Sequence, residues 1–559
     1  MSEIPVIDIF AGPGGLGEGF SALRSNGKRV FRLALSIERD LFAHRTLELR
    51  AFLRYFEDGK GPDAYYDYLR GDIDRSALFQ AHVDAAAHAT QQAWHATLGE
   101  VEEETLDTRI ENALDGASMW ILIGGPPCQA YSLVGRSRMR PVLGTEFESD
   151  ERHFLYKHYL RLIAKHAPPL FIMENVKGLL SSRIDGERIF DRIKQDLMHP
   201  TRSLAHKFGS PDSDDVSYRL YPLGNYGQQM LMHLGDASQD FVVKCEEHGA
   251  AQMRHRVIIL GIREDVLSAL SPLEAPALTV SPLQNIENAI GDLPKLRSGL
   301  SNGHDSDEDW LSTIKDGASQ WIKGQDVPAQ VSARISEALE RLAVPTAGRG
   351  SEFIQEERGA GDAHFYDARI GGICNHATRG HMAADLQRYL FASSYAAAFG
   401  RSPHLGEFPD ALLPAHRNAR SAMSGNLFSD RFRVQVSGRP STTITSHISK
   451  DGHYFIHPDP AQCRSLTVRE AARLQTFPDN YFFEGPRTAQ YVQVGNAVPP
   501  IVASQIAGAL HRLIQTGTRR KAPNGTGDAT RSRQLRTVHV AGTEGISAST
   551  VNTRSSQDR

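Results

Sequence analysis

The sequence MWILIGGPPC occupies residues 119–128 and decides the fold. An unbroken apolar run of this kind is typical of a buried strand, and the glycines and prolines that follow must end it abruptly. Cys128 therefore lies on a stiff loop just past a strand. Ligands bind at the carboxyl ends of the strands in open α/β sheets, so this thiol is a candidate nucleophile. Many cysteines are simply small buried side chains, and taken alone this residue leaves that alternative open.

The first 268 residues alternate strand-like and helix-like stretches, which predicts an α/β domain with a parallel sheet. The expected strands are 6–10, 33–37, 120–123, 170–173 and 257–260. Residues 153–166 have the apolar spacing of an amphipathic helix. Residues 76–116 are polar and helix-like, and we expect them to form an insertion at the edge of the sheet.

The amino-acid composition of the sequence changes after residue 268. Residues 269–455 are rich in Pro, Gly, Ser and His and lose the alternation, which predicts a second, irregular domain. Ordered patterns return in residues 456–515, where we expect helices and a return of the chain to the first domain. Residues 516–559 lack apolar periodicity and are predicted to be a disordered basic tail.

The bulk composition is that of a soluble protein, with 559 residues, 40% of them hydrophobic and 23% charged. No apolar run approaches the ~18 residues that span a membrane, and no secretion signal is visible at the N-terminus. Four scattered cysteines fit a reducing compartment, so we expect a cytoplasmic protein. The net charge of −4 does not by itself indicate nucleic acid, but binding depends on local basic faces, and basic clusters occur at 136–140 and 254–256.

A glycine-rich loop follows the first expected strand. Residues 11–17 read AGPGGLG, and glycines let the backbone approach a ligand closely before a helix begins. Glu38 ends the second strand, where a carboxylate suits the hydroxyls of a ribose. Asp72, in the segment Gly71-Asp72-Ile73, could accept a hydrogen bond from an adenine amino group. Together these features predict a cofactor that contains adenosine, although they do not separate a dinucleotide from S-adenosylmethionine.

Two further segments carry chemistry. Glu174 ends an apolar strand and is therefore partly desolvated, which should raise its pKa and make proton donation feasible near neutrality. Taken alone, this segment slightly favours the alternative of a helix-capping or ion-paired glutamate. Arg254 and Arg256 precede the strand at 257–260 and lie on one face of an extended segment. Paired guanidinium groups suit an anion or a carbonyl oxygen, although a surface ion pair is the alternative.

These parts fit one reaction. C5 of cytosine is a poor nucleophile, but a thiolate that adds at C6 turns the ring into an enamine whose C5 can take a methyl group. A protonated carboxyl group at N3 and an arginine at O2 would stabilise the charge that develops. The target base cannot be reached inside a duplex, so it must be flipped into the pocket.

The chain resembles the DNA (cytosine-5)-methyltransferases of bacteria and phages. The matching segments occur in the family's order and are 8–15, Glu38, 71–73, 125–129, 174–176, the Gln252-x-Arg254-x-Arg256 pattern, 464–478 and 493–500. The resemblance implies an α/β, Rossmann-like S-adenosylmethionine-dependent methyltransferase domain and a target-recognition domain at 269–455. It also implies double-stranded DNA as substrate. We expect a monomer, with a cognate restriction endonuclease as a separate partner.

The resemblance also implies a role for each matching residue. The catalytic residues would be Cys128 as nucleophile, Glu174 at N3, and Arg254 and Arg256 at O2. The S-adenosylmethionine site would comprise Phe10, Ala11, Gly12, Gly14, Gly15, Glu38, Asp72, Ile73, Pro126, Asn496 and Val498. The DNA contacts would include Gln129, Ser132, Arg136 and Arg138.

Three other functions remain open at this point. A tRNA cytosine methyltransferase would carry the same segments but a smaller recognition domain. A dehydrogenase could use the glycine loop for NAD, but it leaves the cysteine loop and the paired arginines unexplained. A non-catalytic DNA-binding relative is the third alternative. Cys374, His376 and His381 have a spacing open to zinc, but without a second close pair we expect no metal.

Overall fold

The computed structural model describes residues 3–126, 151–184, 186–208, 216–224, 238–268, 276–323, 326–356, 364–414 and 431–521. Its centre is an eight-stranded sheet in the order β10-β13-β7-β6-β1-β4-β5, with β11 paired to β13. The strands are β1 (Ile4–Ile9), β4 (Phe31–Glu38), β5 (Ala93–His95), β6 (Ile121–Gly124), β7 (Leu170–Val176), β10 (Tyr218–Pro222), β11 (Val242–Lys244) and β13 (His255–Arg263). All five predicted strands are confirmed, with ends shifted by a few residues.

The strands from β5 to β7 are parallel, whereas β13 runs antiparallel to β7 and β10 antiparallel to β13. Strand β1 lies between β4 and β6, so the chain leaves it in one direction for β4 and later returns on its other side. Such a reversal of strand order opens a crevice at the carboxyl ends of the strands. This is the open, mostly parallel α/β sheet that the alternating sequence predicted.

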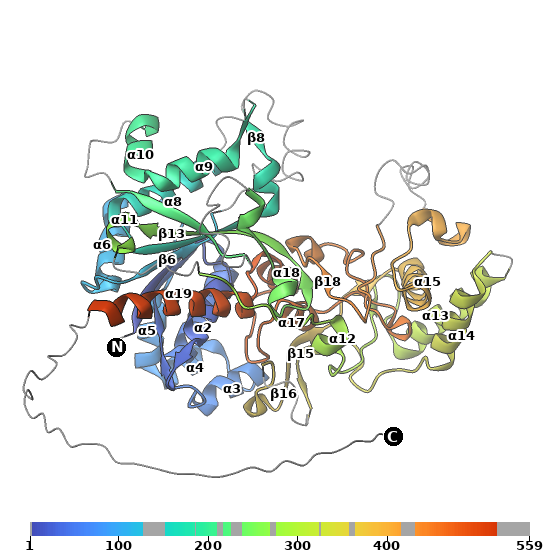
Figure 1. The fold of residues 1–559 in the computed structure, drawn as a ribbon. Coiled ribbons are helices and arrows are strands. Elements are labelled where there is room, and N and C mark those ends of the chain that lie inside the picture. Colours follow the sequence, from blue (N-terminus) through green and yellow to red (C-terminus); the bar gives the residue numbers. More distant parts are fainter. Residues whose placement is uncertain are drawn as a thin grey trace, which may run out of the picture.

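Helices cover both faces of the sheet (Figure 1). One face packs against α1 (Gly15–Ala22) and α19 (Pro500–Lys521). The other packs against α6 (Glu103–Leu114), α8 (Glu151–His166), α9 (Ile189–Met198) and α10 (Pro200–Phe208). Helix α8 confirms the amphipathic helix predicted at 153–166. Helix α19 contributes apolar residues between 502 and 514 to the apolar cluster on its face of the sheet, and it runs past the boundary predicted at residue 515.

The insertion predicted at 76–116 is helical but also contains a strand of the sheet itself. Helices α2 (Leu41–Arg54), α3 (Asp63–Arg70), α4 (Arg75–Ala81) and α5 (Val83–Gln92) lead into β5, which pairs in parallel with β4. Three residues are too few for a visible strand pattern, and polar helices surround them. The strand at this edge of the sheet, β5, therefore could not be recognised from the sequence.

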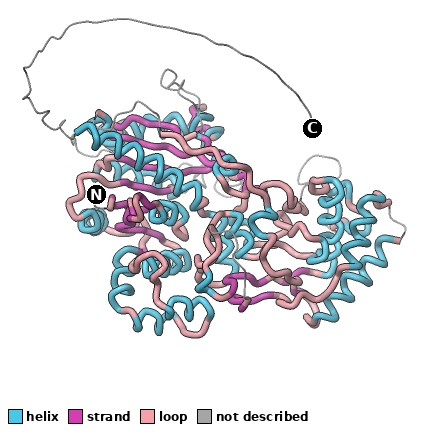
Figure 2. Tube along the Cα trace, turned by 60° about the horizontal axis from the view of Figure 1, so that its bottom comes forward, coloured by secondary structure: helices cyan, strands magenta, loops and turns pink. Residues whose placement is uncertain are grey.

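Residues 269–455 are more regular than their composition predicts. Helices α13 (Asp307–Ile322), α14 (Ala329–Glu340) and α15 (Ala383–Phe399) pack around one apolar cluster. They form a helical lobe at the end of the molecule away from the sheet (Figure 2). Trp310, Ile314, Ala318 and Trp321 share one buried face of α13 at helical spacing.

A third group of elements lies between the sheet and the helical lobe. It includes α12 (Ile286–Ile290), α17 (Val468–Leu474) and α18 (Arg487–Asn496), which share an apolar cluster. Helix α17 lies within residues 456–515, where helices were expected, and its Thr467 and Glu470 form a capping box. The remaining short elements are β2 (Arg24–Ser25), β3 (Lys28–Arg29), β8 (Arg183–Ile184), β9 (Glu187–Arg188), α11 (Glu264–Leu267), β12 (Gln252–Met253), β14 (Gly299–Leu300), β15 (Gly350–Gln355), β16 (Gly372–Ala377), β17 (Gly380–His381) and β18 (Ser441–Thr442).

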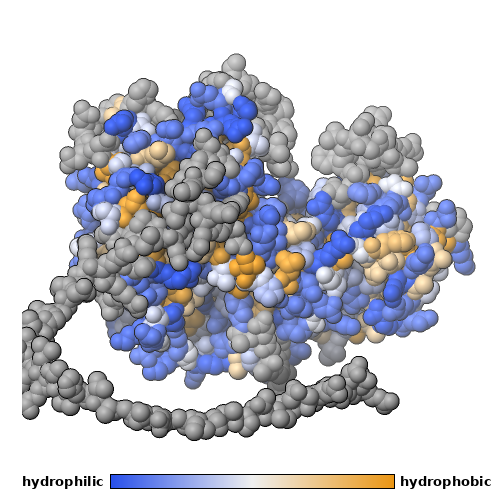
Figure 3. All heavy atoms as spheres, in the orientation of Figure 1, coloured by the Kyte–Doolittle hydropathy of each residue, from blue (hydrophilic) through white to orange (hydrophobic). Residues whose placement is uncertain are grey.

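The face drawn in Figure 3 is mostly hydrophilic, with apolar residues in small separate patches. Among the described residues, no helix combines the length and the apolar character needed to cross a membrane.

Candidate active site

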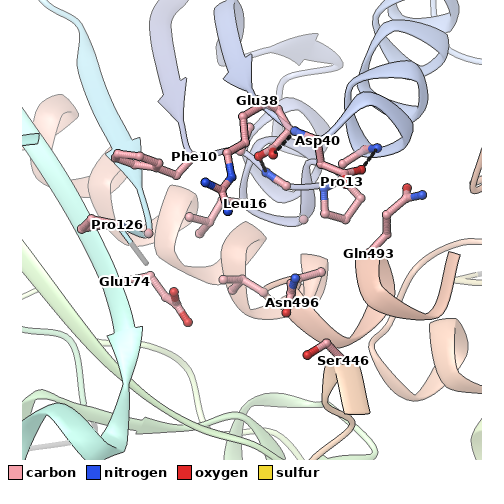
Figure 4. A pocket seen from close by; sticks show the side chains of 18 of the residues that line it. Phe10, Pro13, Leu16, Glu38, Asp40, Pro126, Glu174, Ser446, Gln493 and Asn496 are labelled. Atoms are coloured by element: carbon pink, nitrogen blue, oxygen red, sulfur yellow. Dashed lines mark hydrogen bonds between the residues drawn. The ribbon is translucent and has the colours of Figure 1, made fainter. Parts of the chain in front are cut away.

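A cavity of about 540 Å³ opens at the carboxyl ends of β1, β4, β6 and β7. This is the crevice that the strand order predicts. Residues from the C-terminal part of the chain close it from the other side. Figure 4 shows that Glu38 and Glu174 project from different walls of the cavity. Eleven of the residues proposed from the sequence line it, namely Phe10, Ala11, Gly12, Gly15, Glu38, Pro126, Glu174, Arg254, Arg256, Asn496 and Val498.

The glycine loop needs its glycines for two different reasons. Gly14 has φ +97° and caps the N-terminus of α1, a backbone conformation that other residues rarely adopt. At Gly15, a Cβ atom would lie 2.2 Å from the carbonyl oxygen of Val498. The loop is therefore pressed against the returning C-terminal segment, and Gly14 shapes the wall although it does not itself line the cavity.

Glu38 is fixed by backbone amides. Its Oε2 accepts a hydrogen bond of 2.8 Å from the N–H of Gly12, and its Oε1 accepts one of 2.8 Å from the N–H of Asp40 (Figure 4). Burial raises the pKa of Glu38. Each carboxylate oxygen keeps a further lone pair, so Glu38 can accept hydrogen bonds from a ligand without giving up its own support.

Asp8 lies beneath the same loop and is fully buried. No side chain among the described residues bonds to its carboxylate oxygens, and the backbone of Gly17 interacts with them. Burial, with a contribution from the nearby charge of Glu38, raises the pKa of Asp8 to about 8. The base of the loop therefore favours a protonated, uncharged Asp8 at neutral pH.

Asp72 and Ile73 do not line the cavity, which corrects the expectation that they hold an adenine. Gly71 ends α3 in a left-handed conformation, and the exposed Asp72 pairs with Arg70 Nε at 3.2 Å. Residues 96–98 line the cavity instead, directly after β5. The N–H of Ala96 donates to the carbonyl oxygen of Glu38 at 3.1 Å. The motif at 71–73 is thus a helix end, and the sheet neighbour of Glu38 is a strand that sequence reasoning missed.

The opposite wall holds an ion pair. Glu174 Oε1 lies 2.8 Å from Arg256 Nε, because the antiparallel register places Arg256 opposite Val176, two residues beyond Glu174. A Cβ atom on Gly125 would lie 2.8 Å from Glu174 Oε2, so the backbone just after β6 passes close to this carboxylate. Asn175 Nδ2 donates to the carbonyl oxygen of Pro126 at 3.2 Å. The segment 174–176 therefore both presents a carboxylate and anchors the start of the Pro126-Pro127-Cys128 loop.

Arg254 differs from Arg256 in what it binds. Its side chain is buried and donates to the carbonyl oxygens of Ile444 at 2.8 Å and Gly495 at 3.2 Å. Burial, and to a smaller extent Arg256, lowers the pKa of Arg254 to about 9. Contrary to the prediction, the two arginines therefore do not face one ligand together. Arg256 pairs with Glu174, whereas Arg254 connects the start of β13 to the backbone at residues 444 and 495.

Several lining residues were missed by sequence reasoning: Leu16, Arg39, Asp40, Thr97, Leu98, Ser446 and Gln493. Those at 39–40 directly follow the predicted Glu38, so the end of that strand was a usable signal. Ser446 and Gln493 come from segments that only tertiary packing brings to the cavity.

Cys128, Gln129, Ser132, Arg136 and Arg138 lie outside the described residues, and their roles stay predictions. The three residues considered for zinc are engaged in other contacts. His376 bonds to Thr467 and to the carbonyl oxygen of Pro294, His381 bonds to Ser465, and Cys374 contacts the carbonyl oxygen of Leu69.

Comparisons with known proteins identify the family. A family model described as C-5 cytosine-specific DNA methylase matches residues 76–199 and 228–512. The type II methyltransferase M.Bpa9945I of Bacillus paralicheniformis is 31% identical over 526 residues, covering 91% of this chain and 99% of that protein. M.DdeI of Desulfomicrobium norvegicum is 24% identical, covering 90% of this chain and 87% of its own length.

Among solved structures, the Dnmt2 methyltransferase of S. pombe aligns with 92% of this chain and 99% of its own, at 12% identity and a TM-score of 0.34. The family match spans most of the chain and includes Glu174, Arg254 and Arg256 in the cavity wall. The chain belongs to the C-5 cytosine-specific DNA methylase family and is a DNA (cytosine-5-)-methyltransferase.

Proposed function

We propose that this enzyme methylates C5 of a flipped-out cytosine in a specific duplex sequence, using S-adenosylmethionine and a transient bond between Cys128 and C6. This proposal rests on a cavity whose two walls differ. Glu38 and the glycine loop form one wall, and the Glu174–Arg256 ion pair lies in the other. Gly125 and Pro126 also line the cavity, three and two residues before Cys128 in the chain.

The residues present fit S-adenosylmethionine. The cavity volume of about 540 Å³ lies within the usual range for cofactor sites. Glu38, held by two backbone amides, would accept hydrogen bonds from the ribose hydroxyls of the cofactor. The glycine loop would lie along the methionine portion of the cofactor. Arg39 and residues 96–98 would surround the adenine, because they lie beyond Glu38 on the side away from Glu174. When bound, the cofactor supplies an electrophilic methyl group.

The other three cysteines support Cys128 as the nucleophile. Cys245, Cys374 and Cys463 are buried. Burial raises the pKa of Cys245 and of Cys374 to about 12, and also raises the pKa of Cys463. A buried, protonated thiol is a poor nucleophile. Because two peptide units span at most about 7 Å and Pro126 lines the cavity, we propose that the Cys128 thiol reaches into it.

Cys128 Sγ would add to C6 of the cytosine, and negative charge would then develop toward N3 and O2. Glu174 would donate a proton to N3, and Arg256 would move its guanidinium interaction toward O2. The pair at 2.8 Å keeps these two groups together before the base arrives. After transfer, a base would remove the C5 proton, the C5–C6 double bond would re-form as the sulfur of Cys128 leaves C6, and N3 would return its proton to Glu174.

The base must leave the duplex to enter a cavity at the end of a sheet. Gln129 and Ser132 would occupy the space it leaves, and Arg136 and Arg138 would contact phosphates. We assign residues 269–455, including the helical lobe, to recognition of the duplex sequence. Since the relatives M.Bpa9945I and M.DdeI are named type II methyltransferases, we also propose that methylation protects a site from a separate endonuclease.

Covalent trapping tests the proposal. Duplexes that contain 5-fluorocytosine at a site found by bisulfite sequencing should form a denaturation-resistant complex with the wild-type enzyme and S-adenosylmethionine. Cys128→Ala should give none, whereas Cys245→Ala, which removes a buried thiol, should trap normally. A Cys128→Ala protein that still methylates DNA contradicts the mechanism. A wild-type protein that methylates tRNA instead of duplex contradicts the substrate.

A further inference from the structure

Tyr481 reaches the glycine loop from a distant part of the sequence. Its side chain is fully buried, and its hydroxyl donates a hydrogen bond to the carbonyl oxygen of Pro13. Pro13 lines the cavity between Gly12 and Gly14 (Figure 4). Tyr481 itself does not line the cavity, so it can affect a ligand there only through the loop.

The loop lies closely against this side chain. A Cβ atom on Gly14 would lie 3.0 Å from the Tyr481 hydroxyl and 2.7 Å from Leu47 Cδ2. Gly14 also has the left-handed conformation that begins α1. The tyrosine hydroxyl and the leucine therefore form the surface on which the turn rests, and the hydrogen bond fixes the peptide that precedes the turn.

The ring of Tyr481 is held in place by its neighbours. The rings of Phe477 and Phe483 lie with centroids 4.7 and 5.4 Å from it, and Arg50 Cζ lies 4.5 Å from its centroid. Arg50 in turn bonds to Glu18 in α1, the helix that follows the loop. The same cluster thus holds the turn and the first part of the helix behind it.

The segment that carries Tyr481 is anchored on the side of the recognition region. Asp479 binds Arg473 through two hydrogen bonds of 2.8 and 2.7 Å. Arg473 also bonds to Asp292 and, at 3.2 Å, to the carbonyl oxygen of Ala289 at the end of α12. Tyr481 therefore connects the glycine loop to a segment whose position is set by the buried Arg473–Asp479 ion pair.

We propose that Tyr481 is a positioning residue that sets the affinity for the cofactor by fixing the glycine loop in its binding conformation. This inference rests on the proposed use of S-adenosylmethionine and adds a determinant outside the cavity. A loop that is already ordered loses less conformational freedom when a ligand binds. Without the hydroxyl, the Pro13 carbonyl loses its buried partner and the turn is free to shift.

The test compares Tyr481→Phe with Tyr65→Phe. Tyr65 is also fully buried beside Arg50, but its hydroxyl donates to the carbonyl oxygen of Asn480 at 3.1 Å and not to the loop. Calorimetric titration with S-adenosylhomocysteine should show affinity about 5- to 20-fold weaker for Tyr481→Phe, the range for loss of one buried hydrogen bond. Tyr65→Phe should bind within twofold of the wild type.

Steady-state rates and rescue add further readouts. For Tyr481→Phe, KM for S-adenosylmethionine should rise while kcat at saturating cofactor stays within about threefold. Tyr481→4-aminophenylalanine keeps an N–H donor and should recover most of the affinity, even if the phenylalanine variant folds poorly. Equal affinity in the wild type and Tyr481→Phe overturns this inference. A wild-type protein that binds no S-adenosylhomocysteine overturns the proposed function instead.

Discussion

The two walls of the cavity hold their carboxylates in different ways. Glu38 is bound by two backbone amides, and both come from within the first 40 residues. Glu174 is bound by the side chain of Arg256, which the antiparallel pairing of β7 and β13 brings beside it. The backbone amides that hold Glu38 are fixed by the loop and cannot move to contact a bound ligand. The Arg256 side chain, in contrast, can rotate away from Glu174 and bind the ligand. We therefore propose that the Glu38 wall binds the cofactor and that the Glu174 wall carries out the chemistry.

The largest expected effect tests the wall assigned to chemistry. Glu174→Gln should lower the single-turnover rate by about 10²- to 10³-fold, the scale of losing one general acid. Affinity for S-adenosylhomocysteine should change less than twofold, because Glu174 lies away from the Glu38 wall. Rapid quench with tritiated cofactor measures the rate, and calorimetry measures the affinity. Glu264→Gln, an exposed change, is the control. If Glu174→Gln and Glu264→Gln have the same single-turnover rate, Glu174 does not take part in the chemical step.

The second prediction addresses the other wall. Glu38→Ala should weaken S-adenosylhomocysteine binding by about 10- to 100-fold, because it removes acceptors for the ligand and leaves two amides without their partner. The single-turnover rate at saturating cofactor should stay within about threefold of the wild type. Glu57→Ala, at an exposed site, should change neither quantity. If Glu38→Ala lowers only the single-turnover rate and leaves the affinity unchanged, Glu38 serves the chemical step and not cofactor binding.

A smaller effect would sharpen where the adenine lies. Thr97→Ala should weaken S-adenosylhomocysteine binding by about 3- to 10-fold, the value of one partly exposed hydrogen bond. Asp72→Ala should leave the affinity unchanged, because Asp72 is exposed and pairs with Arg70. Titration of both variants under the same conditions gives the comparison. If Asp72→Ala is the weaker binder, the adenine contacts α3 and the correction made from the structure is itself incorrect.

A separate effect, on stability and not on binding or rate, is expected at the base of the Glu38 wall. The folded protein raises the pKa of Asp8 from 3.8 to about 8, so below pH 4 the folded and unfolded states are both protonated there. Between about pH 4 and 8 the unfolded state ionises first, and stability falls as pH rises. Asp8→Asn lacks this dependence and should become more stable than the wild type by at least about 1 kcal/mol at pH 8.

Denaturant unfolding of both proteins from pH 5 to 8 measures this difference, which should widen steadily with pH. Asp191→Asn, an exposed change, should run parallel to the wild type. A constant gap between Asp8→Asn and the wild type would show that Asp8 is ionised throughout the range.

Local patterns explain why much of the fold was predictable. The apolar runs at 120–123 and 170–173 lie in the centre of the sheet, and a strand buried on both faces must be apolar along its length. The glycines at 12–15 were equally informative, since Gly14 has a positive φ and Gly15 is pressed against Val498. Strand β5 and the helical lobe were missed because one is only three residues long and the other lies in a region whose composition indicated loops.

The sequence by itself determined the α/β sheet and singled out Glu38, Glu174, Arg254 and Arg256, all of which line the cavity. These follow from residue type and near neighbours, which act over a few residues along the chain. Only the tertiary structure decided that residues 96–98 replace 71–73 in the cavity wall, that Arg254 binds Ile444 and Gly495, and that Tyr481 supports Pro13. Those contacts join residues far apart in sequence, and packing and strand pairing set them, which no local pattern records.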